Sequence, residues 1–294
     1  MSYTENICGS IPALITPFSQ SGDIDMNAFK SLLSWHVDKG SHGLVICGTT
    51  GESPTVTDAE HLTLATAAVE NTPEDYPVII GCGSNATQKA IKLTLQAQDA
   101  GASAALIVVP YYNKPSQQGI YAHFKAIHDA TNLPIILYNV PSRTISDISD
   151  ETVVDLAKLE RIIGIKDATG DLQRLDNMKK QIKKDFTFLS GDDMSAAQYI
   201  TRGGNGCISV SANVAPDKCA AVYNLIKTGD TERAMQQDAQ LNALHNAMFV
   251  EPSPAAPKYA LAQMGKIENI LRLPLLPLSA EGITKIENIL KQNT

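Results

Sequence analysis

One lysine of this sequence has the surroundings that carbonyl chemistry requires. Lys166 ends an apolar run, and the two-residue repeat of a β-strand places Ile162 and Gly164 on the same face as Lys166. If that face is buried, the loss of hydration favours the neutral amine over the ammonium. A neutral amine can attack the carbonyl carbon of a ketone or an aldehyde and form a Schiff base. In the alternative interpretation, Lys166 extends into solvent or pairs with Asp167.

Further polar groups follow the ends of other apolar runs, so they could act on the same substrate. Tyr138 could move protons to and from the lysine adduct. The hydroxyls of Thr49-Thr50 and the backbone N–H groups of the adjoining glycines suit a small carboxylate. Arg143 could hold a substrate carboxylate through two parallel hydrogen bonds, and Tyr111-Tyr112 follows another run. Each group also has a structural alternative: a core tyrosine, a simple turn, a surface ion pair or aromatic packing.

The histidines, cysteines and paired acids give little support to metal chemistry. No two of the six histidines have the spacing of an HxH or HExxH motif. Asp192-Asp193 could hold a cation but lacks evident partners, and none of the five cysteines has a convincing base partner. We therefore expect no metal site.

Short runs rich in Val and Ile alternate with amphipathic stretches along most of the chain. The runs are apolar on both faces, as in strands of a parallel sheet that is covered by helices. Among the stretches between them, one opens with Thr57 and Glu60 at capping-box spacing, and another opens with Asp150-Glu151. We expect strands at 11–15, 43–47, 77–80, 105–109, 134–138, 162–166, 186–189 and 207–210.

Eight strand–helix units predict an α/β fold, a (β/α)8 TIM barrel. We assign residues 1–224 to this catalytic barrel and residues 225–294 to a C-terminal helical extension, with helices near 230–249, 255–264 and 281–292. The alternative is an open doubly wound sheet, because the Gly81–Ala86 segment resembles a dinucleotide-binding turn. That match is weak, since the segment lies in the third unit and no acid ends a strand about 20 residues later.

Composition and charge exclude several functional classes. The 294 residues suit one large α/β domain or two small ones, and a content of 44% hydrophobic and 19% charged residues is typical of a globular protein. With 24 basic and 31 acidic residues the net charge is −7, so neither nucleic acid nor an anionic membrane is an expected partner. The absence of long apolar runs and of a basic N-terminal segment, with an odd number of cysteines, leads us to expect a cytoplasmic protein.

Four segments together resemble the dihydrodipicolinate synthase family, a member of the pyruvate-dependent Schiff-base lyases that include N-acetylneuraminate lyase. They are Gly48-Thr49-Thr50-Gly51-Glu52, Pro110–Pro115, Tyr138–Thr144 and Gly164–Gly170. The resemblance extends over nearly the whole chain, from Ile11 to the C-terminal helices. It implies the barrel fold, a homotetramer built as a dimer of dimers, and catalysis without a cofactor.

The resemblance also implies a role for each residue of the site. Lys166 would form the Schiff base, and Tyr138 would donate and accept protons in a relay with Thr49 and Tyr112. In the family this second tyrosine comes from the neighbouring subunit. Arg143 would bind the carboxylate of the second substrate. Thr50 and Ile208 would contact pyruvate, and Gly191 would be a further substrate-binding residue.

The implied reaction joins pyruvate to L-aspartate 4-semialdehyde, early in lysine and diaminopimelate biosynthesis. Two alternatives remain open: a related pyruvate aldolase that acts on a sugar acid, and a non-catalytic barrel that only binds a ligand. Sialic-acid lyases share the lysine and the tyrosine but usually lack the arginine, so Arg143 favours the first reaction.

The resemblance further implies an effector site for lysine at the dimer interface. Its matching residues are Ser53, His61, Asn85 and Tyr111. Two positions differ, because Asp58 stands where a histidine is common and Lys89 where lysine-sensitive members have a glutamate. An effector ammonium would meet like charge at Lys89. We therefore predict weak or absent feedback inhibition by lysine.

Overall fold

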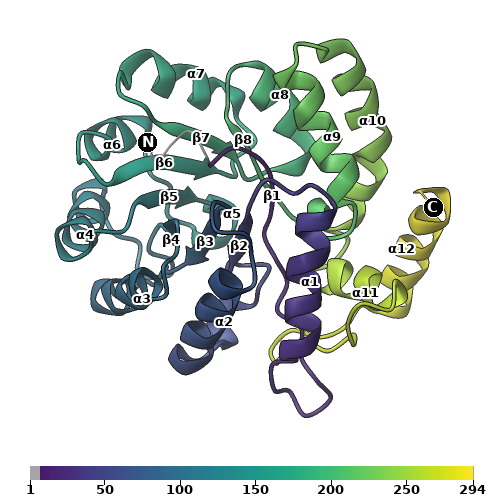
Figure 1. The fold of residues 1–294 in the computed structure, drawn as a ribbon. Coiled ribbons are helices and arrows are strands. Elements are labelled where there is room, and N and C mark those ends of the chain that lie inside the picture. Colours follow the sequence, from purple (N-terminus) through teal and green to yellow (C-terminus); the bar gives the residue numbers. More distant parts are fainter. Residues whose placement is uncertain (1–6, 294) are drawn as a thin grey trace.

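The structure, a computed structural model, describes residues 7–293 and contains one parallel sheet whose eight strands close into a barrel (Figure 1). The hydrogen-bonded order is β1-β8-β7-β6-β5-β4-β3-β2. A parallel bridge between Ala13 and Val45 joins the β1 side to β2. The strands are β1 Gly9–Pro12, β2 Leu44–Ile46, β3 Val78–Gly81, β4 Ala104–Val108, β5 Ile135–Asn139, β6 Ile162–Asp167, β7 Thr187–Ser190 and β8 Gly206–Ser209.

This closure confirms the predicted barrel and excludes the open sheet. The glycines of the Gly81–Ala86 segment have a packing function instead of a nucleotide-binding one. A Cβ atom on Gly81 would lie 2.2 Å from the carbonyl oxygen of Cys47, and a Cβ on Gly83 would lie 2.7 Å from the backbone nitrogen of Val108. The neighbouring strands approach so closely that only glycine fits.

Helices follow the strands and form the outer layer of the barrel. The outer helices are α1 Met26–Asp38, α2 Asp58–Glu70, α3 Thr87–Asp99, α4 Gln117–Ala130, α6 Asp150–Leu156, α7 Leu172–Gln181, α8 Ala196–Thr201 and α9 Pro216–Lys227. Short helical turns follow four strands: η1 Ser53–Thr55, α5 Pro141–Thr144, η2 Asp193–Ser195 and η3 Ser211–Asn213.

Local sequence signals fix where several of these helices begin. The expected capping box is present at α2, where Thr57 Oγ1 accepts the backbone N–H of Glu60 at 3.3 Å and the Glu60 carboxylate accepts the N–H of Thr57 at 2.8 Å. At α6, Ser149 caps the helix and Asp150 and Glu151 occupy its first turn, where the helix dipole favours negative charge.

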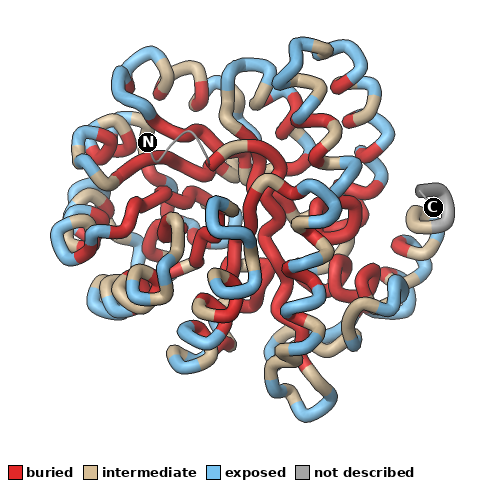
Figure 2. The backbone as a smooth tube through the Cα atoms, viewed as in Figure 1, coloured by how far each residue is buried: buried red, intermediate tan, exposed pale blue. Residues whose placement is uncertain are grey.

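Apolar side chains fill two layers, one inside the barrel and one between the sheet and the helices. Figure 2 shows that the strands consist mainly of buried residues, whereas the outer helices alternate between buried and exposed ones. The strand carrying Lys166 departs from the predicted alternation. The pairing of β5 with β6 shifts register between Ile135 and Ile136, so Ile136 lies opposite Gly164. At this point β6 has one residue more than β5, so the alternation of its side chains is interrupted. As a result, Ile162 packs in the outer layer and Ile163 in the inner one. The prediction that Ile162 shares the face of Lys166 is therefore wrong, whereas the register keeps Gly164 and Lys166 on one face.

The helices after the barrel lie together on one flank (Figure 1). They are α10 Thr231–Ala247, α11 Ala255–Gln263 and α12 Ala280–Asn293, close to the predicted ranges, and they share an apolar cluster with residues that follow β8. The predicted domain boundary after residue 224 falls within α9. Among the described residues, no helix has the length and apolar character needed to cross a bilayer.

Candidate active site

Lys166 and Tyr138 lie side by side at the carboxyl ends of β6 and β5. The two residues are direct partners in the register of these strands. Their side chains are only 6% and 7% exposed, and Lys166 Nζ lies 4.2 Å from the centroid of the Tyr138 ring. The lysine therefore does not extend into solvent. Its amine lies within the barrel against a phenol, which is the arrangement that the Schiff-base hypothesis requires.

Gly191, just after β7, leaves the space through which the lysine side chain passes. A Cβ atom at this position would lie 2.8 Å from Lys166 Cε and 2.7 Å from Ala168 Cβ. Any larger residue would displace the lysine. The structure thus gives Gly191 a steric role beside the amine.

The carboxylate of Asp167 belongs to a different network from Lys166. Asp167 is buried, and its Oδ2 accepts a hydrogen bond from Arg174 Nε at 2.8 Å, while its Oδ1 accepts the backbone N–H of Thr169 at 2.8 Å. The Arg174 guanidinium also lies 3.4 Å from Asp150. The alternative in which Lys166 pairs with Asp167 is therefore wrong, because successive residues of a strand point to opposite faces.

The Thr49-Thr50 segment forms a tight turn after β2. The N–H of Gly51 donates to the Gly48 carbonyl and the N–H of Glu52 donates to the Thr49 carbonyl, both at 3.1 Å. Glu52 has a positive φ of 57°, which is uncommon for a residue with a side chain. Thr50 is buried and Thr49 is half-buried.

A pocket opens from the top of the barrel beside this turn. Val140 lines it and also belongs to the apolar cluster inside the barrel, so the pocket and the barrel interior meet. Ile208 lies in the same interior cluster as Tyr138. The predicted site residues on the pocket wall are Thr49, Arg143, Ser53, His61, Tyr111, Asp58 and Lys89.

Seven predicted site residues do not line this pocket: Thr50, Asn85, Tyr112, Tyr138, Lys166, Gly191 and Ile208. The backbone carbonyl of Asn85 accepts a hydrogen bond from Asn113 Nδ2 at 2.9 Å. Tyr112 has a φ of 73°, and its side chain is 88% exposed. Within one chain, Tyr112 therefore points away from Lys166, and a relay with Thr49 is not formed.

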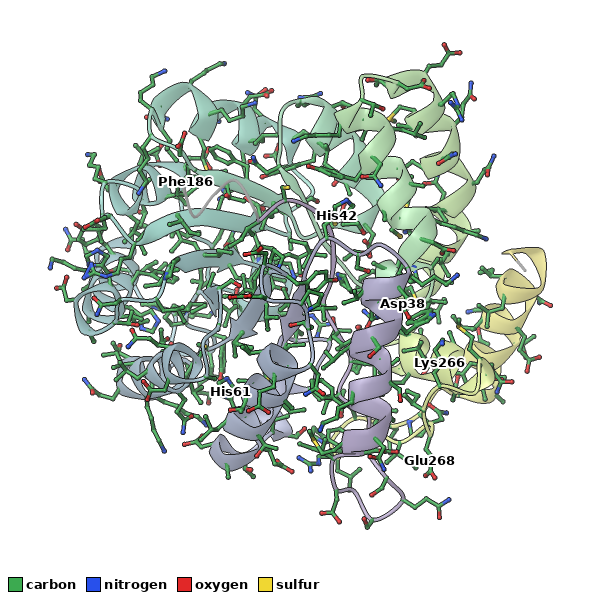
Figure 3. The ribbon with its side chains drawn as sticks, viewed as in Figure 1. Asp38, His42, His61, Phe186, Lys266 and Glu268 are labelled. Atoms are coloured by element: carbon green, nitrogen blue, oxygen red, sulfur yellow. The ribbon has the colours of Figure 1, made fainter. Side chains whose placement is uncertain are left out.

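In the part of the pocket around α2, the charges differ from those of lysine-sensitive family members: an acid, Asp58, stands where a histidine is common, and a base, Lys89, stands where they have a glutamate. His61, labelled in Figure 3, donates from Nε2 to the Gly81 carbonyl at 3.0 Å, which leaves Nδ1 as an acceptor, and burial lowers the pKa of this imidazole. Asp58 accepts from Lys92 at 2.6 Å and lies 3.7 Å from Lys89. The two unusual positions thus form an ion pair with each other.

The sequence analysis did not identify the buried polar residues that contact the segments carrying the site residues. Glu52 forms a fully buried ion pair with Lys258 of α11, and Asn139 donates to Asp147 at 2.8 Å next to Arg174. Glu52 belongs to a motif that was recognised, but nothing local to it identifies a partner in the C-terminal extension. Within residues 7–293, no three His, Cys, Asp or Glu side chains are placed to hold a metal ion.

Comparisons with known proteins agree with this geometry. The sequence matches the Dihydrodipicolinate synthetase family over residues 6–293. It is 46% identical over 286 residues to the 4-hydroxy-tetrahydrodipicolinate synthase of Pseudoalteromonas atlantica, with 97% of this chain and 98% of that protein covered. It is 50% identical over 269 residues to the enzyme of the same name from Rhodospirillum centenum, with 92% of each covered.

The fold of a solved relative is nearly superimposable. The crystal structure of the dihydrodipicolinate synthase from Acinetobacter baumannii, complexed with pyruvate, has a TM-score of 0.95 and 41% identity, covering 97% of this chain and 98% of that one. Identity at this level over nearly full length, together with the buried lysine and tyrosine at the strand ends, establishes the family. This chain belongs to the dihydrodipicolinate synthetase family.

Proposed function

We propose that Lys166 of this chain forms a Schiff base with pyruvate and that the enzyme condenses it with L-aspartate 4-semialdehyde. The activity is that of a 4-hydroxy-tetrahydrodipicolinate synthase, a lyase of lysine and diaminopimelate biosynthesis. The observation that carries the proposal is the Lys166 amine, buried and 4.2 Å from the Tyr138 ring centroid at the carboxyl end of the barrel.

The proposed reaction begins with attack of the Lys166 amine on the ketone carbon of pyruvate. Proton transfers convert the carbinolamine into an imine and release water. Loss of a methyl proton gives an enamine, whose carbon attacks the aldehyde of the second substrate. The amino group of that substrate then attacks the imine carbon, closes the ring and releases Lys166. The protonated imine nitrogen accepts an electron pair when the methyl proton leaves and gives it back when the carbon–carbon bond forms.

Other residues of the site would bind and orient the two substrates. Thr50 and Ile208 would contact the pyruvate adduct, Gly191 would leave room for it beside the Lys166 side chain, and Arg143 would hold the carboxylate of the semialdehyde. Their fixed positions make the carbon–carbon step effectively unimolecular. Tyr138, relayed through Thr49, would transfer the protons.

The relay needs a tyrosine from a second subunit. Tyr112 is 88% exposed, and its backbone has a positive φ. Residues in uncommon backbone conformations cluster at functional sites, and a ring that is exposed in one chain is accessible to a second subunit. We propose that Tyr112 of one subunit enters the site of its neighbour in a tight dimer, that two such dimers form a homotetramer, and that the enzyme is cytoplasmic.

Reductive trapping tests the proposed chemistry. We expect that borohydride treatment of the protein in the presence of pyruvate adds one pyruvyl group, and that peptide mapping by mass spectrometry places it on Lys166. A protein treated without pyruvate is the control. An adduct on another lysine would refute the assignment.

Replacement of Arg143 by alanine tests the binding of the second substrate. Arg143 is exposed on the pocket wall. The loss of a charge-assisted hydrogen bond should raise the KM for the semialdehyde by about 10- to 100-fold, while the KM for pyruvate changes little. Steady-state kinetics with each substrate varied checks this. Arg202→Ala, which removes a surface ion pair with Asp176, is the control. An unchanged semialdehyde KM would contradict the role.

Lysine feedback should be weak or absent, because Lys89 places positive charge on the pocket wall. Activity measured against increasing lysine should stay near its uninhibited value at physiological lysine concentrations. The double substitution Asp58→His/Lys89→Glu should increase sensitivity to lysine, since the ammonium would then meet an acid. Strong inhibition of the unmodified enzyme would overturn this prediction.

A further inference from the structure

A buried ion pair connects the C-terminal extension to the threonine turn of the active site. Glu52 comes directly after Thr49-Thr50-Gly51, and Lys258 lies on α11. The carboxylate and the ammonium are in direct contact, and both side chains are completely buried. Among the lysines of residues 7–290, whose burial the structure describes, no other is as fully enclosed.

The remaining contacts of the ammonium also hold it in place. Lys258 Nζ donates to the carbonyl oxygen of Ile270 at 2.7 Å and lies 4.2 Å from the centroid of the Phe18 ring. Despite the carboxylate, burial lowers the pKa of Lys258 to about 8. The charge is therefore kept at a cost in hydration that a solvent-exposed lysine would not have.

Arg272, which lies further along the same extension, also forms hydrogen bonds with Glu52 and with residues that follow it. Its backbone N–H donates to Glu52 Oε2 at 3.0 Å, and its guanidinium donates to the carbonyl oxygen of Thr55 at 2.8 Å and to the Glu60 carboxylate at 2.9 Å. Both oxygens of Glu52 thus have partners from the extension, one from Lys258 and one from Arg272.

This arrangement is better explained by positioning than by stability. A buried ion pair usually stabilises a fold no more than an apolar pair of the same size, because the desolvation of both charges offsets their attraction. Here the pair contacts Glu52 where its backbone is left-handed, with φ 57°, at the end of the turn that carries Thr49 and Thr50. Strained backbone of this kind persists only where its surroundings enforce it.

We propose that Lys258 is a positioning residue, which acts through Glu52 to fix the hydroxyls of Thr49 and Thr50 at the active site. The inference rests on the proposed function, in which Thr49 relays protons and Thr50 binds pyruvate. It makes the C-terminal extension part of the catalytic apparatus. A displacement of about 1 Å at the turn can lower the rate by about two orders of magnitude.

The experiment compares variants that separate charge balance from positioning. Lys258→Met removes the cation and leaves a buried carboxylate. Glu52→Gln/Lys258→Met removes both charges, so it should recover the thermal midpoint that the single variant loses. Lys285→Met removes a lysine of the same extension that pairs with Glu281 on the exposed face of α12, and it is the control.

A positioning role predicts a specific kinetic pattern. In the double variant kcat should stay about 10- to 100-fold below that of the unmodified enzyme, the KM for pyruvate should rise several-fold, and the KM for the semialdehyde, bound at Arg143, should change by less than about twofold. Trapping of pyruvate by borohydride should slow in parallel. General destabilisation would not separate the two KM values.

The outcomes are distinct. If kcat recovers together with the thermal midpoint in the double variant, Lys258 only balances charge and the inference is overturned. If neither variant folds, Glu52→Gln alone decides, because it keeps the side-chain shape: an unchanged kcat overturns the inference, and a loss of about threefold or more supports it. An unmodified enzyme without turnover or a pyruvate adduct would instead refute the proposed function.

Discussion

Lys166→Ala is expected to lower kcat by at least about 10³-fold, the largest effect of any single substitution in this chain. The amine is the nucleophile of the proposed reaction, and alanine leaves no group that can form the imine. The variant should also lose the pyruvyl adduct on borohydride treatment. Coupled assays of turnover and intact-mass measurement check the two effects independently.

The fold should survive this substitution. The Lys166 side chain lies in the space beside Gly191, where a shorter side chain also fits. The neighbouring Asp167 carboxylate pairs with Arg174, so the loss of the lysine leaves no buried charge without its partner. Circular dichroism should therefore show an unchanged barrel. Lys180→Ala, an exposed lysine on α7, provides the matched control with full activity. Retention of turnover in Lys166→Ala would end the Schiff-base mechanism for this protein.

Tyr138→Phe is expected to lower kcat by about 10²- to 10⁴-fold, which is the usual contribution of a positioned acid–base group. The ring would remain against the lysine, because the contact at 4.2 Å involves the ring face and not the hydroxyl. Loss of the hydroxyl removes only the group that gives and takes protons. Pyruvate should therefore still be trapped on Lys166, but more slowly.

Pre-steady-state trapping and steady-state turnover, measured together, check this prediction. Tyr121→Phe removes a phenol hydroxyl from the outer helix α4 and should leave kcat unchanged. A Tyr138→Phe enzyme with a kcat close to that of the unmodified protein would show that another group transfers the protons.

The barrel and the position of its active site could be predicted because both depend on local patterns. Each strand lies within a few residues of its predicted range, since buried parallel strands read as short apolar runs. The carboxyl ends of such strands meet on one face, so Lys166 and Tyr138 could be brought together before any contact was known. The family resemblance added their roles.

The detail that failed, the face of Ile162, depends on contacts between strands. The register shift beside Ile136 places Ile162 outside the barrel interior. The sequence of β6 by itself does not indicate that its pairing with β5 is irregular. Tyr112 is a different case, since it was predicted to enter the site of a neighbouring subunit: its side chain is exposed and its backbone has a φ of 73°.

The sequence by itself determined the order of the elements, the capping of α2 and the chemical groups at the strand ends, because these follow from periodicity and from neighbouring residues. Only the tertiary structure decided which charges meet: Asp167 with Arg174, and Glu52 with Lys258. The partner of a buried charge depends on which distant segments of the chain come to lie beside it. Because burial excludes water, a buried charge that lacks its ionic partner destabilises the fold.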